Sequence, residues 1–248
     1  MSPTELAAPS FFTEYLPHVS VDCVVFGFDA RGLQVLLLKM KHCNDWALPG
    51  GFVRQQEGVE SAATRVLQER TGLEQVFLQQ FRVFSEPRRS AANKWTSENE
   101  DLQAWLNQRF ITIGFYALVP FEKVAPQPDS ISDACSWWNL ADVGKLMLDH
   151  NAILHSALEA LRLQMRYQPI GYNLLPEKFT MPELQKLYET VLGQTLDRRN
   201  FQRRMLDFGL LEKLPERKTG VAHKAPFYYR FNKTQYDKAL EEGLAGGW

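Results

Sequence analysis

The chain has 248 residues, which is enough for one large domain or two smaller ones, each with its own core. Hydrophobic residues make up 45% and charged residues 23%, as in a soluble globular protein, and no apolar run approaches the roughly 20 residues of a membrane span. Three cysteines without paired spacing indicate neither a disulfide framework nor a zinc site, and the N-terminus lacks a secretory pattern. We therefore expect a cytoplasmic protein.

The net charge of −1 conceals an uneven distribution of charge. Residues 172–233 contain 12 Lys and Arg against 7 Asp and Glu, whereas the rest of the chain contains 16 against 22. A basic module on an acidic body indicates an anionic partner for the C-terminal third alone.

The first half of the chain begins with a predicted hairpin. Val19–Phe28 and Leu33–Met40 are rich in β-branched and apolar residues, and the turn residues 29–32 separate them. Pro49-Gly50-Gly51 follows as a loop in which backbone can approach a ligand closely. A helix is expected over Val59–Arg70, because Gly72 stands where helix C-termini prefer glycine.

Further elements are expected over residues 75–165. Two strands are expected at 75–84 and 110–121, and a short helix at 100–108 is expected in the polar insert between them. A third, short strand is expected near Trp137-Trp138. A helix from about Asn151 then places four apolar residues on one core-facing stripe: Leu154, Leu158, Leu161 and Met165.

A domain boundary is expected near Tyr167–Tyr172, which gives domains 1–168 and 169–248. Beyond it, Thr180 and Glu183 have the spacing of a capping box. The helix that follows has an apolar stripe and ends at a glycine: Leu184, Leu187, Tyr188, Val191 and Gly193.

A second, basic helix follows at once. Asp197 is placed to cap it, and Phe201, Met205 and Phe208 are expected to face inward. The opposite face is polar and basic: Arg198, Arg199, Gln202 and Arg203. Two strands then bracket a basic loop at 216–225: 210–215 and 227–232. This layout predicts a winged helix that binds DNA.

The first domain also carries a motif with defined spacing: Gly51, Glu57, Arg65, Glu69 and Gly72. This frame resembles the Nudix box. Together with the C-terminal module, the chain resembles the Nudix-related transcriptional regulators. The resemblance implies an α+β protein, in which a Nudix-fold α/β/α sandwich with a mixed sheet is followed by a winged helix-turn-helix domain. It also implies that Glu57 and Arg65 tie the loop to the helix.

The catalytic part of the box is degenerate. Nudix hydrolases carry three glutamates at the positions held here by Val66, Glu69 and Arg70. Carboxylates at such spacing share a helix face and hold magnesium. A unit positive charge about 5 Å from a divalent cation is repelled by roughly 6 kcal/mol at an effective dielectric near 20. We therefore expect no metal, no cofactor and no catalysis, but a pocket retained for binding.

The resemblance places an effector pocket beside the glycine loop and the box helix, with Arg54 and two arginines of the insert as further walls: Gly50, Gly51, Phe52, Arg54, Arg65, Glu69, Arg70, Arg88 and Arg89. Members of this family sense ADP-ribose and related nucleotides or, in a sugar-catabolic branch, a pentose. The variant box looks more like the second branch, so the expected effector is a sugar or a sugar derivative.

DNA contacts are expected from the basic helix and the wing. Arg198, Arg199, Gln202 and Arg203 would reach base edges in the major groove. Three wing residues would contact phosphate: Lys218, His223 and Lys224. A homodimer on a palindromic operator is expected, because one winged helix reads only a few base pairs.

Two other functions remain open from the sequence. One is a hydrolase of ADP-ribose or another nucleoside diphosphate derivative that recruits carboxylates from the insert: Glu98, Glu100 or Asp101. The other is a small-molecule-binding protein whose winged helix contacts proteins. Four tryptophans are expected to serve core or interface packing: Trp46, Trp95, Trp137 and Trp138. His150 is expected to lie in a turn or at the start of a helix.

Overall fold

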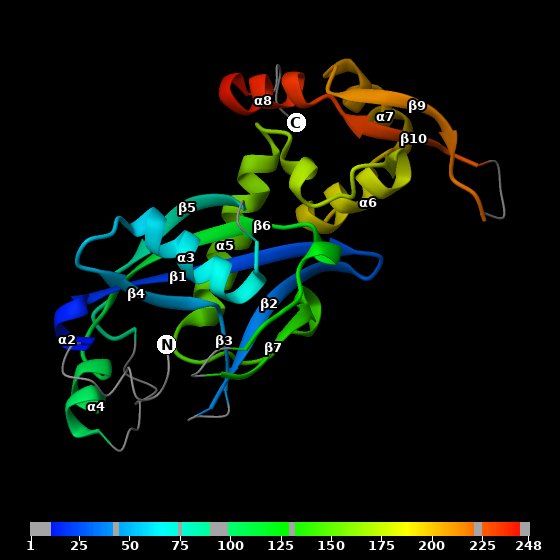
Figure 1. Ribbon diagram of the computed structural model, residues 1–248. Coiled ribbons are helices and arrows are strands. Elements are labelled where there is room, and N and C mark those ends of the chain that lie inside the picture. The colour runs from blue at the N-terminus through cyan, green and yellow to red at the C-terminus, as the bar shows by residue number, and fades with distance from the viewer. Residues whose placement is uncertain are drawn as a thin grey trace. The chain divides into compact units, whose positions relative to one another are not determined.

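The computed structural model describes residues 11–41, 45–73, 76–89, 99–128, 132–220 and 225–243. The chain divides into two compact units, whose elements are labelled in Figure 1. The first contains residues up to Gly27 and Gln34–Ala157, and the second contains Phe28–Leu33 and the residues from Leu158 onward. No helix among the described residues is long and apolar enough to cross a lipid bilayer.

The first unit is built on a mixed sheet, to which the described residues contribute seven strands. In chain order these are β1 (Tyr15–Asp29), β2 (Gly32–Met40), β3 (Trp46–Ala47), β4 (Gly50–Arg54), β5 (Phe77–Phe84), β6 (Ile111–Leu118) and β7 (Ser132–Asn139). The order across the sheet is β3-β2-β1-β6-β5, with β4 paired to β1 and β7 paired to β2. The predicted hairpin is confirmed as β1 and β2, and β7 is longer than the short strand that was expected.

Strand β1 is central because it has neighbours on both edges. It runs parallel to β6, from Val19 opposite Ile111 to Phe26 opposite Leu118, and antiparallel to β4. Successive residues of a strand point to opposite faces of the sheet. Val21, Cys23 and Val25 therefore share one apolar face, whereas Asp22 points to the other.

Helices cover both faces of this sheet (Figure 1). Helix α3 (Val59–Thr71) packs its Ala62, Ala63, Val66 and Leu67 on the apolar face of β1, and it ends at Gly72, whose φ of 71° is left-handed. Helix α5 (His150–Met165) begins on the other face, beside Asp22. This arrangement is the predicted α/β/α sandwich, and the predicted limits of α3 are correct within one residue.

Shorter helical elements complete the first unit. They are α2 (Phe11–Glu14), α4 (Glu100–Leu106) and the 3-10 turns η1 (Phe121–Lys123) and η2 (Leu140–Asp142). Helix α4 confirms the helix predicted in the insert, and Asn99 caps it by accepting a hydrogen bond from the backbone N–H of Leu102 at 3.0 Å. The buried residues Leu102 and Trp105 attach α4 to Tyr15 and Phe110.

The second unit is a winged helix, as predicted. Its elements are η3 (Ile170–Asn173), β8 (Phe179–Thr180), α6 (Met181–Leu192), α7 (Arg198–Asp207), β9 (Leu211–Arg217), β10 (Phe227–Phe231) and α8 (Lys233–Glu242). The three strands form an antiparallel sheet in the order β8-β10-β9. The last helix, α8, was not predicted from the sequence. Its Tyr236 is fully buried and packs on Tyr172 and Phe231.

The predicted core of the second unit is confirmed. Leu184, Leu187, Tyr188 and Val191 are buried along α6, and Tyr188 meets Phe201 of α7 with ring centroids 5.5 Å apart. Phe208 is only partly buried, since it caps α7 at its C-terminal end. The last turns of α5 belong to this unit, where Leu161 and Met165 are buried and Leu158 is half-buried.

Candidate functional site

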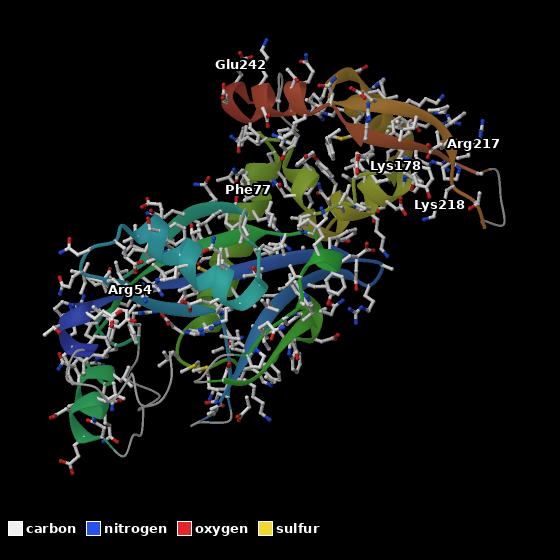
Figure 2. All side chains as sticks on the ribbon, in the orientation of Figure 1. Arg54, Phe77, Lys178, Arg217, Lys218 and Glu242 are labelled. Carbon is white, nitrogen blue, oxygen red and sulfur yellow. The ribbon has the colours of Figure 1, made fainter. Side chains whose placement is uncertain are left out.

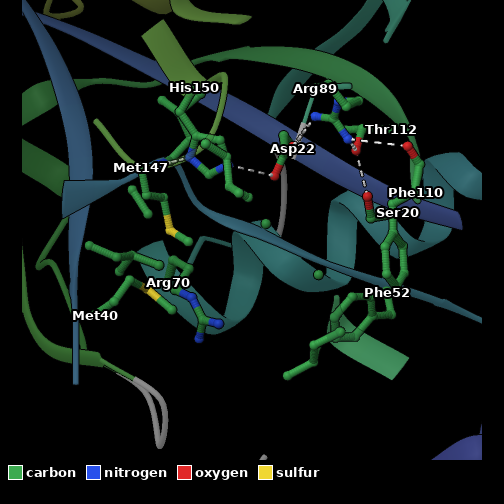
Figure 3. Close-up of a pocket in the computed structure, with 17 residues that line it drawn as sticks. Ser20, Asp22, Met40, Phe52, Arg70, Arg89, Phe110, Thr112, Met147 and His150 are labelled. Atoms are coloured by element: carbon green, nitrogen blue, oxygen red, sulfur yellow. Dashed lines mark hydrogen bonds and ion pairs between the residues drawn. The ribbon is translucent and has the colours of Figure 1, made fainter. Parts of the chain in front are cut away.

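A pocket opens in the first unit above the loop between β3 and β4 (Figure 3). More than half of its lining residues are apolar, and its polar residues gather in a few places. The lining residues are Ser20, Asp22, Leu38, Met40, Ala47, Leu48, Gly50, Gly51, Phe52, Arg70, Arg89, Leu106, Phe110, Thr112, Met147, Leu148 and His150. Such a mixture of apolar surface and a few converging polar groups is typical of a small-molecule site.

The glycine loop allows its neighbours to come unusually close. A Cβ atom on Gly50 would collide with the Asp22 carboxylate, and a Cβ on Gly51 would stand 2.8 Å from Cγ2 of Val66. Pro49 holds the loop to β1 by accepting a hydrogen bond from the backbone N–H of Cys23 at 2.7 Å. Both glycines are therefore needed because side chains of β1 and α3 fill the space beside them.

Glu57 and Arg65 tie this loop to α3, as the resemblance implied. Arg65 donates to Glu57 at 2.6 and 3.2 Å and to the carbonyl of Phe52 at 2.9 Å. Glu57 also accepts from the backbone N–H of Arg54 at 2.8 Å. Burial alone would raise the pKa of Glu57, but its hydrogen bonds with Arg65 and Arg54 outweigh burial and hold the pKa below its usual value. The hydrogen bonds that join the glycine loop to α3 are thus present, although the catalytic glutamates of the box are not.

The three positions of the lost carboxylate set have separate environments. Val66 is buried against Gly51, and Arg70 is buried at the pocket with a side-chain exposure of 6%. Glu69 is 42% exposed and pairs with Arg65 at 3.6 Å and with Arg70 at 3.9 Å. These residues do not fit a magnesium ion, because one carboxylate held by two guanidinium groups is a poor ligand. Among the described residues, no three His, Cys, Asp or Glu side chains are grouped as metal ligands.

A buried polar network forms the floor of the pocket (Figure 3). Arg89 donates to both carboxylate oxygens of Asp149 at 2.8 and 2.9 Å and to the Thr112 hydroxyl at 2.5 Å. The hydroxyls of Thr112 and Ser20 are 2.6 Å apart. Arg89 also lies 3.8 Å from the carboxylate of Asp22. The sequence predicted Arg89 as a wall but missed its partners.

His150 joins this network at the first residue of α5. Its Nδ1 accepts a hydrogen bond from the backbone N–H of Leu48 at 2.9 Å, and its Nε2 faces the Asp22 carboxylate at 3.9 Å. Burial lowers the pKa of His150, although Asp22 and Asp149 act in the opposite direction. Burial likewise raises the pKa of Asp22, against the effects of His150 and Arg89. His150 is therefore the helix-start residue that was expected, and it also lines the pocket.

Aromatic rings form the opposite wall. Phe52 lies 5.5 Å from Phe110 and 4.8 Å from Trp105, measured between ring centroids, and Trp105 lies 4.9 Å from Phe110. Trp105 comes from α4, so the insert supplies the support for this wall. The sequence had named Phe52 but not Trp105 or Phe110. An i, i+3 apolar pair, Leu102 and Trp105, was the available signal in α4.

The structure brings only some of the predicted pocket residues together. Gly50, Gly51, Phe52, Arg70 and Arg89 line the pocket, whereas four others do not: Arg54, Arg65, Glu69 and Arg88. Arg54, labelled in Figure 2, pairs with Glu14 at 3.0 Å on the surface, and Arg88 is exposed.

The alternative carboxylates and the tryptophans lie apart from this pocket. Glu100 and Asp101 are exposed in the first turn of α4, and Glu98 lies outside the described residues. Trp46, Trp137 and Trp138 do not line the pocket, and Trp95 lies outside the described residues.

In the second unit, α7 presents the predicted basic face. Asp197 caps the helix by accepting from the backbone N–H of Asn200 at 2.9 Å. Phe201 and Met205 are buried, whereas Arg198, Arg199 and Arg203 are exposed and Gln202 is half-buried. Among the described residues, no carboxylate pairs with these three arginines. The face is therefore open to an anionic partner.

Charged residues in and beside the wing form ion pairs that the sequence did not predict. Lys218 pairs with Glu183, the capping-box residue of α6, at 2.6 Å, and Lys178 pairs with Glu216 at 2.9 Å. Both lysines are labelled in Figure 2. Glu183 also accepts from the backbone N–H of Thr180 at 2.6 Å. His223 and Lys224 lie outside the described residues. A phosphate contact by Lys218 stays a prediction.

Comparison with known proteins relates both units to described families. Residues 16–160 match the NUDIX domain, and residues 171–231 match the NrtR DNA-binding winged helix domain. An ADPR responsive transcriptional repressor NtrR of Acinetobacter baylyi is 33% identical over 229 residues, covering 89% of this chain and 84% of that protein.

Solved structures also match most of the chain. Shewanella oneidensis NrtR complexed with a 27mer DNA has a TM-score of 0.72 and 26% identity, covering 88% of this chain and 95% of that chain. A MutT/nudix family protein from Enterococcus faecalis has a TM-score of 0.65 and 24% identity, covering 88% and 87%, which shows the fold alone.

Proposed function

Because this chain belongs to the Nudix-related transcriptional regulators, which are ligand-responsive DNA-binding proteins, we propose that it is a repressor whose effector is ADP-ribose. Effector binding is assigned to residues 1–168 and DNA binding to residues 169–248. The A. baylyi relative is named as an ADPR responsive repressor, which supports this choice.

The composition of the pocket supports ADP-ribose rather than a free pentose as the effector. Nine of its lining residues are apolar: Leu38, Met40, Ala47, Leu48, Phe52, Leu106, Phe110, Met147 and Leu148. A free pentose has a hydroxyl on nearly every carbon and would leave this surface unmatched. A nucleotide offers a planar base for the rings of Phe52 and Phe110 and charged groups for the arginines. The sugar derivative expected from the sequence is therefore ADP-ribose in this proposal.

DNA binding is assigned to α7, with Arg198, Arg199, Gln202 and Arg203 on the exposed face of the helix. Arginine can bind guanine, and glutamine can bind adenine, through two hydrogen bonds each. We propose that the protein acts as a homodimer on a palindromic operator, since paired winged helices read two half-sites. Sedimentation of the protein with and without operator DNA tests the oligomeric state.

The test of function measures operator binding by fluorescence anisotropy, using the promoter DNA adjacent to the gene, with ADP-ribose or arabinose added. We expect ADP-ribose to change operator affinity by roughly 5- to 150-fold and arabinose to have no effect. By linkage, operator DNA should change the affinity for ADP-ribose by the same factor. An effect of arabinose without an effect of ADP-ribose would contradict the proposal.

The same preparation separates regulation from hydrolysis. With magnesium or manganese present, the protein should not hydrolyse ADP-ribose faster than the background rate, because Val66 and Arg70 replace two metal ligands. Turnover that is abolished by Glu69→Gln would instead identify a hydrolase.

A further inference from the structure

We propose that the Asp22 carboxylate and the His150 imidazole form a subsite that binds a ribose hydroxyl group of the effector. This inference rests on the proposed function, because it assigns one part of the same pocket to one part of ADP-ribose. It makes Asp22 a specificity-determining residue that selects a ribose over a deoxyribose.

The hydrogen bonding of Asp22 is the first observation. Asp22 lines the pocket and is only 8% exposed. Figure 3 shows its carboxylate between Arg89, at 3.8 Å, and His150, at 3.9 Å. Both distances are longer than the roughly 3.2 Å of a hydrogen bond. In the part of the chain that the structure describes, no group donates a hydrogen bond to this carboxylate. A buried carboxylate in this condition costs free energy, which a donor on a ligand would recover.

The nearest cation cannot serve as that donor without giving up its own contacts. Arg89 donates to both oxygens of Asp149, at 2.8 and 2.9 Å, and to the Thr112 hydroxyl. Its guanidinium group is therefore held by Asp149, a shorter ion pair than the one with Asp22. Asp22 thus has a compensating charge nearby but keeps its capacity to accept hydrogen bonds.

The orientation of His150 is the second observation. Its Nδ1 accepts a hydrogen bond from the backbone N–H of Leu48 at 2.9 Å, so the proton of the neutral ring is on Nε2. Burial lowers the pKa of His150, which favours this neutral form. Within the described residues, the Nε2–H faces Asp22 Oδ1 across 3.9 Å and donates no hydrogen bond. The pocket therefore presents one donor and one acceptor side by side.

The glycine loop keeps this pair accessible. Gly50 is the partner of Asp22 where β4 pairs with β1, and a Cβ atom on Gly50 would stand 2.3 Å from Oδ1 of Asp22. Oδ1 is also the oxygen that faces His150. Any larger residue in place of Gly50 would therefore cover the acceptor, whereas glycine leaves it open to a ligand in the pocket.

The chemistry of the pair selects a hydroxyl group. A hydroxyl both donates and accepts, so one oxygen between Oδ1 of Asp22 and Nε2 of His150 can form hydrogen bonds with both. The phosphates of ADP-ribose carry the same sign of charge as Asp22 and are repelled. The amino group of adenine only donates and would leave the Nε2–H without an acceptor. Burial raises the pKa of Asp22, and a hydroxyl that donates to the carboxylate stabilises its charged form.

The experiment is isothermal titration calorimetry on the full-length protein in EDTA. The ligands are ADP-ribose and its deoxy analogues, each of which lacks one vicinal hydroxyl of the adenosine ribose or of the terminal ribose. At least one analogue should bind roughly 10- to 100-fold more weakly than ADP-ribose, because a hydrogen bond to a charged group is lost. The position of the missing hydroxyl identifies which of the two riboses lies at Asp22.

Two variants test whether the loss arises at this pair. Asp22→Asn keeps the shape of the side chain but removes its charge, so the penalty for the sensitive analogue should fall to roughly fivefold or less. His150→Asn keeps an acceptor for the N–H of Leu48 but removes the Nε2–H, and it should also reduce the penalty. A merely structural role would weaken ADP-ribose and the analogue alike, with their ratio unchanged.

A matched control removes the charge of an exposed aspartate in the same unit. Asp142→Asn should change neither the Kd of ADP-ribose nor its ratio to the Kd of the analogue. Melting temperatures show whether each variant is folded. If Asp22→Asn does not fold, the deoxy analogues on wild-type protein and on His150→Asn still decide the question.

The possible failures are distinguishable. If every deoxy analogue binds as tightly as ADP-ribose, or if the ratio is the same in wild type and Asp22→Asn, the subsite is refuted while the effector assignment stands. A loss of affinity on replacing adenine by hypoxanthine that Asp22→Asn abolishes would show that Asp22 binds the base, and it would also refute the subsite. If wild-type protein binds no ADP-ribose, the proposed function fails first and the inference falls with it.

Discussion

The arginine side chains at the pocket of the first unit are buried and paired, whereas those on the open face of α7 in the second unit are exposed. Arg89 has 6% side-chain exposure and two hydrogen bonds to Asp149, while Arg199 and Arg203 lie on the open face of α7. A small ligand is recognised best by groups already fixed in place, because fixing them on binding would cost entropy. DNA attracts exposed cations over a distance and tolerates their motion. The environment of each set of arginines thus suits it to a different kind of recognition.

The largest effect is expected where a buried arginine is removed. Arg89→Ala leaves Asp149 and Asp22 without the cation that compensates them, so the free energy of unfolding should fall by about 3–5 kcal/mol. Denaturation in urea, followed by tryptophan fluorescence, measures the loss. The neighbouring Arg88→Ala is the matched control, because Arg88 is exposed and should change stability by no more than about 0.5 kcal/mol. Equal losses in both variants would mean that the network contributes nothing.

An intermediate effect is expected on α7, and it should appear in binding rather than in stability. Arg199→Ala or Arg203→Ala should cost about 1–3 kcal/mol of discrimination for the cognate operator over random DNA. Anisotropy titrations with both DNAs at fixed salt give this difference directly. Lys238→Ala removes one charge from α8, where Lys238 pairs with Glu242 at 3.8 Å, and serves as control. A control that loses as much discrimination would show that only net charge matters.

The smallest effect is expected for Lys218. Burial alone would raise the pKa of Glu183, but hydrogen bonds from Lys218 and Thr180 outweigh it and hold the pKa below its usual value. A carboxylate with a depressed folded pKa contributes stability that is present above its unfolded pKa near 4.5 and is lost as pH falls through the folded pKa. Lys218→Ala should therefore cost less than about 1 kcal/mol at pH 7, and the difference from wild type should shrink below pH 4.5.

Thermal unfolding between pH 3 and 7 checks that profile, and DNA titrations check the alternative role. If Lys218 instead contacts phosphate, the variant should weaken all DNA sequences alike and flatten the salt dependence. A pH-independent stability difference would contradict the pairing with Glu183.

Local patterns in the sequence were enough to predict most of the fold. Gly72 and Gly193 both adopt left-handed φ values at the ends of α3 and α6, where the sequence placed them. The capping residues Thr180 and Asp197 also act as predicted. These signals are readable because a cap and its helix lie within a few residues of each other.

The pocket could be predicted only in part, because its network joins distant residues. Asp22, Arg89 and Asp149 come from three separate segments, and nothing local to Asp22 indicates that it faces His150. Helical spacing put Glu69 and Arg70 on the same face, yet only Arg70 reaches the pocket. The two differ by about 100° of rotation around the helix axis, which a pattern of i, i+3 and i+4 does not resolve.

The packing of Val66 on Gly51 makes the loss of the metal site difficult to reverse. Val66→Glu alone would put a carboxylate into a buried space beside Gly51 that the valine methyl group already fills. Arg70→Glu alone would leave the valine methyl group where a ligand oxygen is needed. Restoring the three carboxylates of the hydrolase pattern therefore needs substitutions at two positions together, 66 and 70.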